Sequence, residues 1–255
     1  MPLTEKQMRA FNDIGFTVVK GLFSPDEMVE ISAWADGLRD KQPSPGEEAK
    51  YYEVSPITGD NLLVRIENVI GDHNRAVSDM LISDKTKECL AQLLGEPPVL
   101  FKEKINYKLP GCRADKLHQD QAAGWNAYGK FYITMAIAVD ENRLENGALS
   151  FMCSGNYEKV LMSEEWKPLT EDDPSYLPAD EYVLLEADPG DVIFFDAFVP
   201  HGSPANTGTR SRRNIFLTFN RESDGDKRAR YYRDKWANYP PNQEGEARKD
   251  RSFRV

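Results

Sequence analysis

The chain has 255 residues, of which 40% are hydrophobic and 29% are charged, and this composition favours a single folded domain spanning 1–255. Its formal net charge of −10 argues against electrostatic binding to nucleic acid or to an anionic membrane, so a small molecule is the expected partner. The sequence contains no secretion signal, no bilayer-length apolar run and no cysteine framework, so we expect a cytoplasmic protein of undetermined oligomeric state.

The first part of the chain, 1–95, is expected to be mainly helical. Thr4 and Gln7 form a capping box that begins one helix, and Gly15 ends it before a strand over 16–20. Ser24 and Pro25 then begin a second helix.

Proline and glycine interrupt the next segment, 39–61, which we interpret as a long loop, either a lid or a plain surface excursion. A strand is expected over 62–69, and one or two helices over 74–94 are expected to end at Gly95.

From residue 99 the hydrophobic period changes to two, which predicts β-strands. Six short β-rich runs follow, at 99–109, 131–140, 147–152, 182–187, 190–198 and 212–220. Asn146-Gly147 is a sequence typical of a hairpin turn. Strands without intervening helices indicate an antiparallel sandwich or barrel core over 99–220, so the fold class is mainly β with flanking α-helices. The tail, 221–255, is charged, but its tyrosines and Trp236 indicate that it packs back onto the core.

A candidate metal site lies in the stretch KLHQDQAAGW. On an extended segment the side chains of His118 and Asp120 point the same way. His201 follows a strongly apolar strand and is the natural third ligand, whereas His73 lies in a turn-like stretch that needs no metal. Two histidines and one carboxylate suit non-haem Fe(II), although zinc also accepts such ligands.

An arginine suggests an anionic co-substrate. Arg212 lies eleven positions after His201 and opens the strand RRNIFLTFN. A buried guanidinium is costly unless it meets an anion, and its planar fork matches a carboxylate. We therefore infer a dicarboxylic co-substrate, and we expect at least two among Arg210, Arg212 and Arg213 to form only surface ion pairs.

The H-x-D motif, the late histidine in PHGS and the arginine after it, with KINYKLPG before and ENGALSFM between, resemble the phytanoyl-CoA dioxygenase family over nearly the whole chain. The resemblance implies a double-stranded β-helix (jelly-roll, cupin-like) core. It implies Fe(II) bound by His118, Asp120 and His201, and 2-oxoglutarate held by Arg212. Further co-substrate contacts are implied for Ser203, Arg65, Asn106 and Gln119.

The same resemblance implies a dioxygenase reaction. The expected outcome is hydroxylation of an unactivated C–H bond with O₂, releasing succinate and CO₂, through iron-centred chemistry without a separate acid or base residue. The phrases HQDQAAGW and RIEN are similar to bacterial members that act on small amines and phosphonates such as 2-aminoethylphosphonate.

The substrate-binding residues are less determined. Gln121 and Trp125 follow the metal motif, and Trp125 either walls the pocket or belongs to the core. Lys104 and Lys108 share a strand face with Lys102 and Asn106; we expect that face to point outward, whereas an inward face would imply an anionic substrate.

Three alternatives stay open: a cupin-type metal enzyme that does not use 2-oxoglutarate, a non-catalytic sensor of iron and 2-oxoglutarate, and an enzyme acting on an acyl-CoA or another large lipid.

Overall fold

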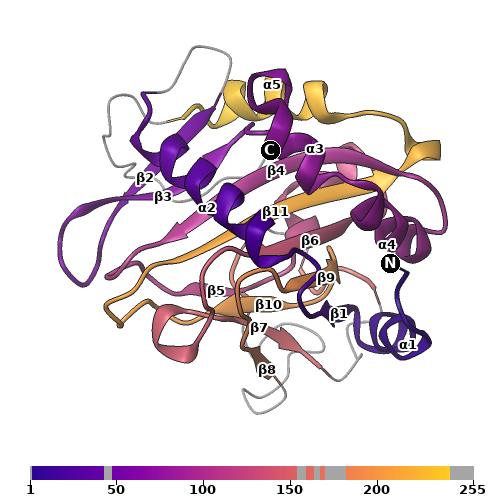
Figure 1. Cartoon of the computed structure of the whole chain (residues 1–255), viewed down its shortest axis with the longest axis horizontal. Coiled ribbons are helices and arrows are strands. Elements are labelled where there is room, and N and C mark those ends of the chain that lie inside the picture. The colour runs from indigo at the N-terminus through magenta and orange to yellow at the C-terminus, as the bar shows by residue number, and fades with distance from the viewer. Residues whose placement is uncertain (1, 43–47, 154–158, 164–166, 170–181, 242–255) are drawn as a thin grey trace.

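The computed structural model describes residues 2–42, 48–153, 159–163, 167–169 and 182–241 (Figure 1). Its α-helices are α1 (Glu5–Ile14), α2 (Pro25–Asp40), α3 (Arg75–Leu81), α4 (Asp84–Leu94) and α5 (Arg228–Asn238). Its strands are β1 (Phe16–Val19), β2 (Ala49–Val54), β3 (Asn61–Glu67), β4 (Pro98–Lys108), β5 (Asp115–His118), β6 (Ile133–Ala138), β7 (Leu149–Met152), β8 (Tyr182–Leu185), β9 (Val192–Asp196), β10 (His201–Ser203) and β11 (Arg212–Arg221).

The strands form two antiparallel sheets. The larger sheet has the order β1-β9-β6-β11-β4-β3-β2 and the smaller one β5-β10-β7-β8. The two sheets lie as separate layers, with β5, β10, β7 and β8 below the long strands in Figure 1. This two-sheet architecture with flanking helices confirms the predicted fold class, and the N-terminal part contributes β1, β2 and β3 to the larger sheet besides its helices.

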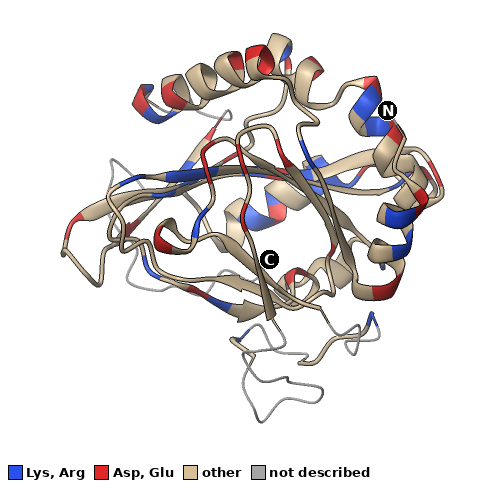
Figure 2. Cartoon of the chain, turned by 60° about the horizontal axis from the view of Figure 1, so that its bottom comes forward, with Lys and Arg blue, Asp and Glu red and all other residues tan. Residues whose placement is uncertain are grey.

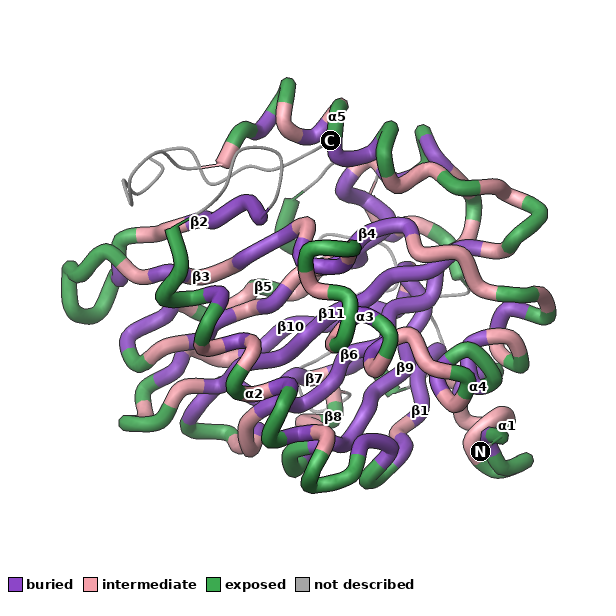
Figure 3. The backbone as a smooth tube through the Cα atoms, turned by 45° about the horizontal axis from the view of Figure 1, so that its top comes forward, coloured by how far each residue is buried: buried purple, intermediate pink, exposed green. Residues whose placement is uncertain are grey.

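The two faces of the larger sheet have different partners. Ile105, Tyr107, Ile215 and Leu217 pack in one apolar cluster with side chains of α2 and α4. Because side chains alternate along a strand, the intervening residues of β4 and β11 face the smaller sheet. The strands are largely buried while the covering helices carry exposed positions (Figure 3). Lys104, Asn106 and Lys108 of β4 and Arg212 and Phe216 of β11 line a cavity on this side of the larger sheet.

The residues predicted to begin and end the N-terminal helices are confirmed. Thr4 and Gln7 form a capping box, as do Ser24 and Glu27, and Gly15 adopts a left-handed conformation where α1 ends. Gly95 likewise ends α4 with a φ of 75°. No helix in the described ranges is long and apolar enough to cross a membrane.

Two predictions about connections are wrong. The segment 39–61 was predicted as a loop, but it contains β2, which pairs with β3 along its length. Asn146-Gly147 does not make a hairpin, because β6 before it and β7 after it lie in different sheets. Gly147 still has a positive φ of 85°, so the turn residue was recognised while its long-range connection was not.

The C-terminal segment packs back as predicted. Helix α5 lies against β4, and Tyr231 and Tyr232 are buried in an aromatic cluster with Phe101 and Trp125. The Tyr232 hydroxyl donates to the carbonyl of Glu103 and accepts from its backbone N–H. The described part of the tail is therefore an integral element of the fold.

Candidate metal centre

Three side chains from two paired strands meet between the sheets. β5 and β10 pair antiparallel, and His118 and His201 are direct Cα partners in that register. Asp120 begins a short 3-10 helix immediately after β5. One potential ligand atom from each of these residues lies within 4.8 Å of the others, and no other group of three metal-binding side chains occurs in the described part of the chain. The predicted triad is thus brought together, and His73 lies outside it on an exposed 3-10 turn.

The two imidazoles are oriented by the backbone. The Nδ1 atom of His118 lies 2.7 Å from the carbonyl of Lys116, and that of His201 lies 2.9 Å from the carbonyl of Val199. With Nδ1 protonated, both Nε2 atoms are available as ligands, and they lie 3.7 and 3.9 Å from the carboxylate oxygens of Asp120.

The protonation states also suit a cation. Burial and the neighbouring His118 together lower the pKa of His201 to about 4. Burial alone would raise the pKa of Asp120, but His201, Lys104 and His118 lower it to about 2. A neutral imidazole and an anionic carboxylate are the forms that bind a metal. The donor set of two nitrogens and one carboxylate fits Fe(II) with open coordination positions.

A cavity of about 470 Å³ opens beside the triad. Its lining includes all three potential ligands, and β3, β4 and β11 contribute five further polar side chains: Arg65, Lys104, Asn106, Lys108 and Arg212. Val64, Leu149 and Phe216 supply apolar lining. This size and mixture of surfaces are typical of a pocket for a small ligand.

Arg212 is buried in that cavity. Its side chain is 1% exposed, and its Nε and Nη2 atoms donate to the carbonyl of Gly147 at 3.1 and 2.8 Å. Its Nη1 atom has no hydrogen-bond partner within the described ranges. Burial lowers the pKa of Arg212 to about 10, which still leaves it charged at neutral pH. A buried cation with an unused donor is suited to bind a carboxylate.

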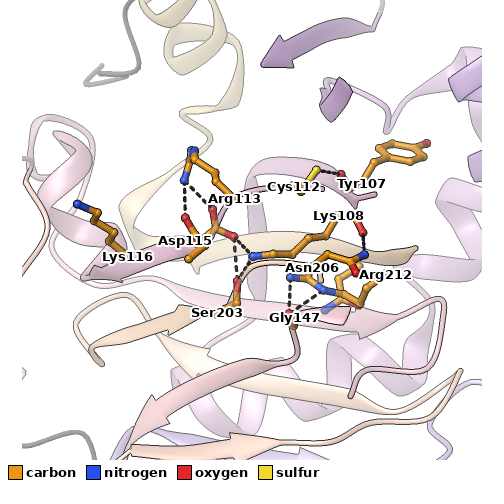
Figure 4. Close-up of polar contacts among 12 residues, drawn as sticks. Tyr107, Lys108, Cys112, Arg113, Asp115, Lys116, Gly147, Ser203, Asn206 and Arg212 are labelled. Carbon is orange, nitrogen blue, oxygen red and sulfur yellow. Dashed lines mark hydrogen bonds and ion pairs between the residues drawn. The ribbon is translucent and has the colours of Figure 1, made fainter. Parts of the chain in front are cut away.

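Two residues of the site were not predicted. Figure 4 shows Asp115 at the centre of a polar group, where it accepts from Lys108 at 3.0 Å, from Ser203 at 2.9 Å and from Arg113 at 3.2 Å. Lys108 also donates to Ser203. Burial alone would raise the pKa of Asp115, but Lys108, Arg113 and Arg212 hold it below its usual range. The signal for this group was the alternating Arg113-x-Asp115 directly before the H-x-D motif.

The expectation that the lysine face of β4 points outward is wrong. Lys108 pairs in register with Arg212, Asn106 with Asn214, and Lys104 with Phe216. Lys102 and Lys108 are buried, and Lys104 lines the cavity. The period of two indicated that these side chains share a face, but the packing of β4 against helices decided which face it was.

Four residues with predicted binding roles lie outside the cavity lining, namely Gln119, Gln121, Trp125 and Ser203. Gln119 donates to the carbonyls of Val160 and Phe198, and Gln121 donates to Asn126 and to the carbonyl of Gly129. Trp125, 1% exposed, packs in the aromatic cluster with Phe101, so its core alternative describes its position. Ser203 bonds to Asp115 and Lys108, which do line the cavity.

Two other arginines near Arg212 form ion pairs elsewhere: Arg210 does so at the surface, as expected, whereas the ion pairs of Arg213 are formed by a buried side chain. Arg210 is exposed and contacts Glu141 at 2.5 Å. Arg213 contacts Asp140 at 2.7 Å and Asp36 at 3.1 Å, which links β11 to α2. Arg212 is therefore the member of this run that reaches the cavity.

Comparisons with known proteins found a matching family model, related enzymes and similar solved structures. Residues 11–214 match the family model described as phytanoyl-CoA dioxygenase (PhyH). The chain is 37% identical to a 2-aminoethylphosphonate dioxygenase from the uncultured bacterium HF130_AEPn_1, over 98% of this chain and 94% of that protein. It is 30% identical to a methylphosphonate hydroxylase from Gimesia maris, over 91% and 86%. Among solved structures, EctD from S. alaskensis with 2-oxoglutarate and 5-hydroxyectoine is similar, with a TM-score of 0.72 at 22% identity over 87% of this chain and 77% of EctD.

Proposed function

Since this chain belongs to the phytanoyl-CoA dioxygenase family, we propose that it is an Fe(II)- and 2-oxoglutarate-dependent dioxygenase that hydroxylates a small phosphonate. One observation carries this proposal: a single cavity holds the three potential metal ligands and the buried Arg212, whose Nη1 atom lacks a partner in the described part of the structure. The first candidate substrate is 2-aminoethylphosphonate, with a similar amine or amino acid as the alternative within the same reaction class.

In this proposal the residues of the cavity have separate roles in binding the metal and the co-substrate. His118, Asp120 and His201 hold Fe(II), and three protein ligands leave coordination positions for small molecules. Bound iron supplies the oxidising chemistry, in which O₂ and 2-oxoglutarate are consumed and succinate and CO₂ are released. Arg212 holds the distal carboxylate of 2-oxoglutarate through its free Nη1 donor.

The polar group around Asp115 keeps the arginine side of the cavity in place. Lys108 and Ser203 both bond to Asp115, and Lys108 lies opposite Arg212 in the β4–β11 register. Asn106 and Arg65, which pair across β3 and β4, line the same wall. Fixed donors of this kind orient a co-substrate without reorganising when it binds.

The phosphonate assignment is supported by two relatives whose names state phosphonate substrates and which align with most of this chain. The cavity volume of about 470 Å³ suits a small polar molecule beside 2-oxoglutarate better than a long acyl chain. An acyl-CoA carrier would also favour a basic molecule, whereas this chain has a net charge of −10.

The burial of Arg212 argues against the cupin-type alternative. A metal enzyme that does not use 2-oxoglutarate has no need for a buried arginine in the cavity, and Arg212 is 1% exposed there. A non-catalytic sensor would keep every residue of the cavity, so turnover is the property that distinguishes it from an enzyme.

The test of the proposed function is succinate release. Purified protein with Fe(II), 2-oxoglutarate and O₂ is expected to release succinate faster with 2-aminoethylphosphonate than without it, and to yield a hydroxylated phosphonate by mass spectrometry. Asp120→Ala is the matched inactive control. Equal succinate release with and without every phosphonate, amine and amino acid tried would contradict the assignment of a substrate-coupled dioxygenase.

A further inference from the structure

Two cations of the cavity wall, Arg65 and Lys104, belong to a larger group of positive charges. Together with the buried Lys102 and Lys235 behind the lining they form what is here called the buried cation cluster, and the buried Glu67 is the carboxylate whose charge acts on all four. Figure 2 shows Lys and Arg positions along the strands of the fold as well as on the surface helices. Burying cations without matching anions is costly, so this cluster indicates a place for a further anion.

Within the cluster, most cations already have partners. Glu67 accepts from Lys235 at 2.8 Å and lies 2.9 Å from Nε of Arg65. Lys102 lies over the rings of Trp125 and Tyr231, at 4.8 and 5.6 Å from their centroids. These contacts occupy the part of the cluster that faces α5 and the aromatic core.

Lys104 differs from these neighbours. It lines the cavity together with Asp120, its ammonium lies 4.9 Å from the centroid of Phe216, and neither a hydrogen bond nor an ion pair holds it in the described part of the chain. Burial lowers the pKa of Lys104, as expected for an ammonium that lacks a bonded carboxylate. Lys108, two positions along on the same face, is bonded to Asp115 and Ser203.

The acidic side chains of the cavity are all engaged among the residues described. Glu53 accepts from Arg113 at 2.7 and 3.0 Å, Asp115 accepts from Lys108, and Asp120 belongs to the triad. This part of the pocket therefore offers an unpaired cation to a ligand, while its carboxylates are already used.

From this arrangement, and resting on the proposed function, we propose that Lys104 binds the acidic group of the primary substrate. The pocket accordingly selects a small anion such as a phosphonate by its acid group and not by its amine. A phosphonate presents three oxygen acceptors and up to two negative charges, which suit an ammonium in the cavity wall that no carboxylate of the described residues bonds. Arg212 serves the co-substrate separately, because it lies opposite Lys108 and Lys104 lies opposite Phe216, four register pairs away.

Equilibrium binding tests the assignment without turnover. The anaerobic protein, loaded with Fe(II) and 2-oxoglutarate, is titrated with methylphosphonate and with 2-aminoethylphosphonate by calorimetry, and 2-oxoglutarate affinity is followed by the visible band of its iron chelate. Lys104→Met removes the charge and keeps the length of the side chain. Lys130→Met is the control, because Lys130 is exposed and lies outside the cavity lining.

We expect Lys104→Met to raise the Kd of both phosphonates by about tenfold or more, with little change in 2-oxoglutarate affinity, and Lys130→Met to bind like the wild type. If the chelate band is intact and Lys104→Met binds both phosphonates as tightly as the wild type, Lys104 does not bind the acid group. The proposed function is not affected by that result. A wild-type protein that forms no chelate band overturns the proposed function instead.

A competition experiment on the unaltered protein covers the case in which Lys104→Met does not fold. Inorganic phosphate is expected to compete with 2-aminoethylphosphonate, whereas ethanolamine, which keeps the amine and lacks the acid group, is not. Competition by ethanolamine with none by phosphate would show that the amine is the recognised group and would overturn the proposal.

Discussion

At the scale of single residues, the buried arginine gives the first prediction. Arg212→Ala is expected to weaken 2-oxoglutarate binding by about tenfold to a hundredfold, because a hydrogen bond to a charged group is worth roughly 1.5–3 kcal/mol. The measurement is an anaerobic titration of the Fe(II)-loaded protein with 2-oxoglutarate. Arg210→Ala is the control, since Arg210 is exposed and paired with Glu141. Unchanged affinity in Arg212→Ala would place the co-substrate carboxylate elsewhere.

Residue type and position were enough to predict the side chains whose chemistry allows few roles. His118, Asp120, His201 and Arg212 were predicted in this way, and the structure places all four around one cavity. The sequence could not decide which way the β4 lysines point, because a period of two indicates a shared face without saying what covers it. Asp115 and Arg113 were missed since their role depends on contacts with Lys108 and Glu53 in other strands.

At the scale of elements, the predicted strands were those with long apolar periodicity. β4, β6, β9 and β11 follow such runs, whereas β5 and β10 are only four and three residues long and too short to show a period. Yet β5 and β10 position the two histidines, because their pairing sets His118 opposite His201. Short strands of this kind are defined by their partners in the sheet and not by their own sequence.

The ion pair between Glu67 of β3 and Lys235 of α5 predicts how the stability of the fold depends on pH. Burial alone would raise the pKa of Glu67, but Lys235, Arg65 and Lys102 lower it to about 2 from an ordinary 4.5. Between these values the unfolded chain binds a proton that the folded chain does not, so the stabilisation is complete above the higher value and is lost as the pH falls through this window.

We therefore expect wild type to lose up to about 2 kcal/mol more than Glu67→Gln between about pH 5 and about pH 3. The measurement is the urea unfolding free energy of both proteins at the two pH values. Glu30→Gln, a change at an exposed position of α2, controls for general charge effects and should lose as much as wild type. Parallel losses in Glu67→Gln and wild type would mean that this carboxylate does not contribute to acid sensitivity.

At the scale of the whole molecule, the fold class and the packing of the tail followed from the sequence, while the connections between sheets did not. Pattern and composition indicated strands without helices between them, which is enough for a β-sandwich. The placement of β2 in the larger sheet and the crossing from β6 to β7 depend on pairings between distant segments. Those pairings create the cavity, since its walls come from β3, β4, β5, β10 and β11.

The proposed function requires that one cavity binds Fe(II) and 2-oxoglutarate together. The most direct measurement is an anaerobic titration of the apoprotein with Fe(II) and then 2-oxoglutarate, monitored by the visible metal-to-ligand charge-transfer band of the chelate. We predict the band in wild type and in His73→Ala, and its loss in His118→Ala, Asp120→Ala and His201→Ala. Iron binding without the band in wild type would contradict a shared site for Fe(II) and 2-oxoglutarate. Equal loss of the band in His73→Ala would contradict the assignment of the three metal ligands.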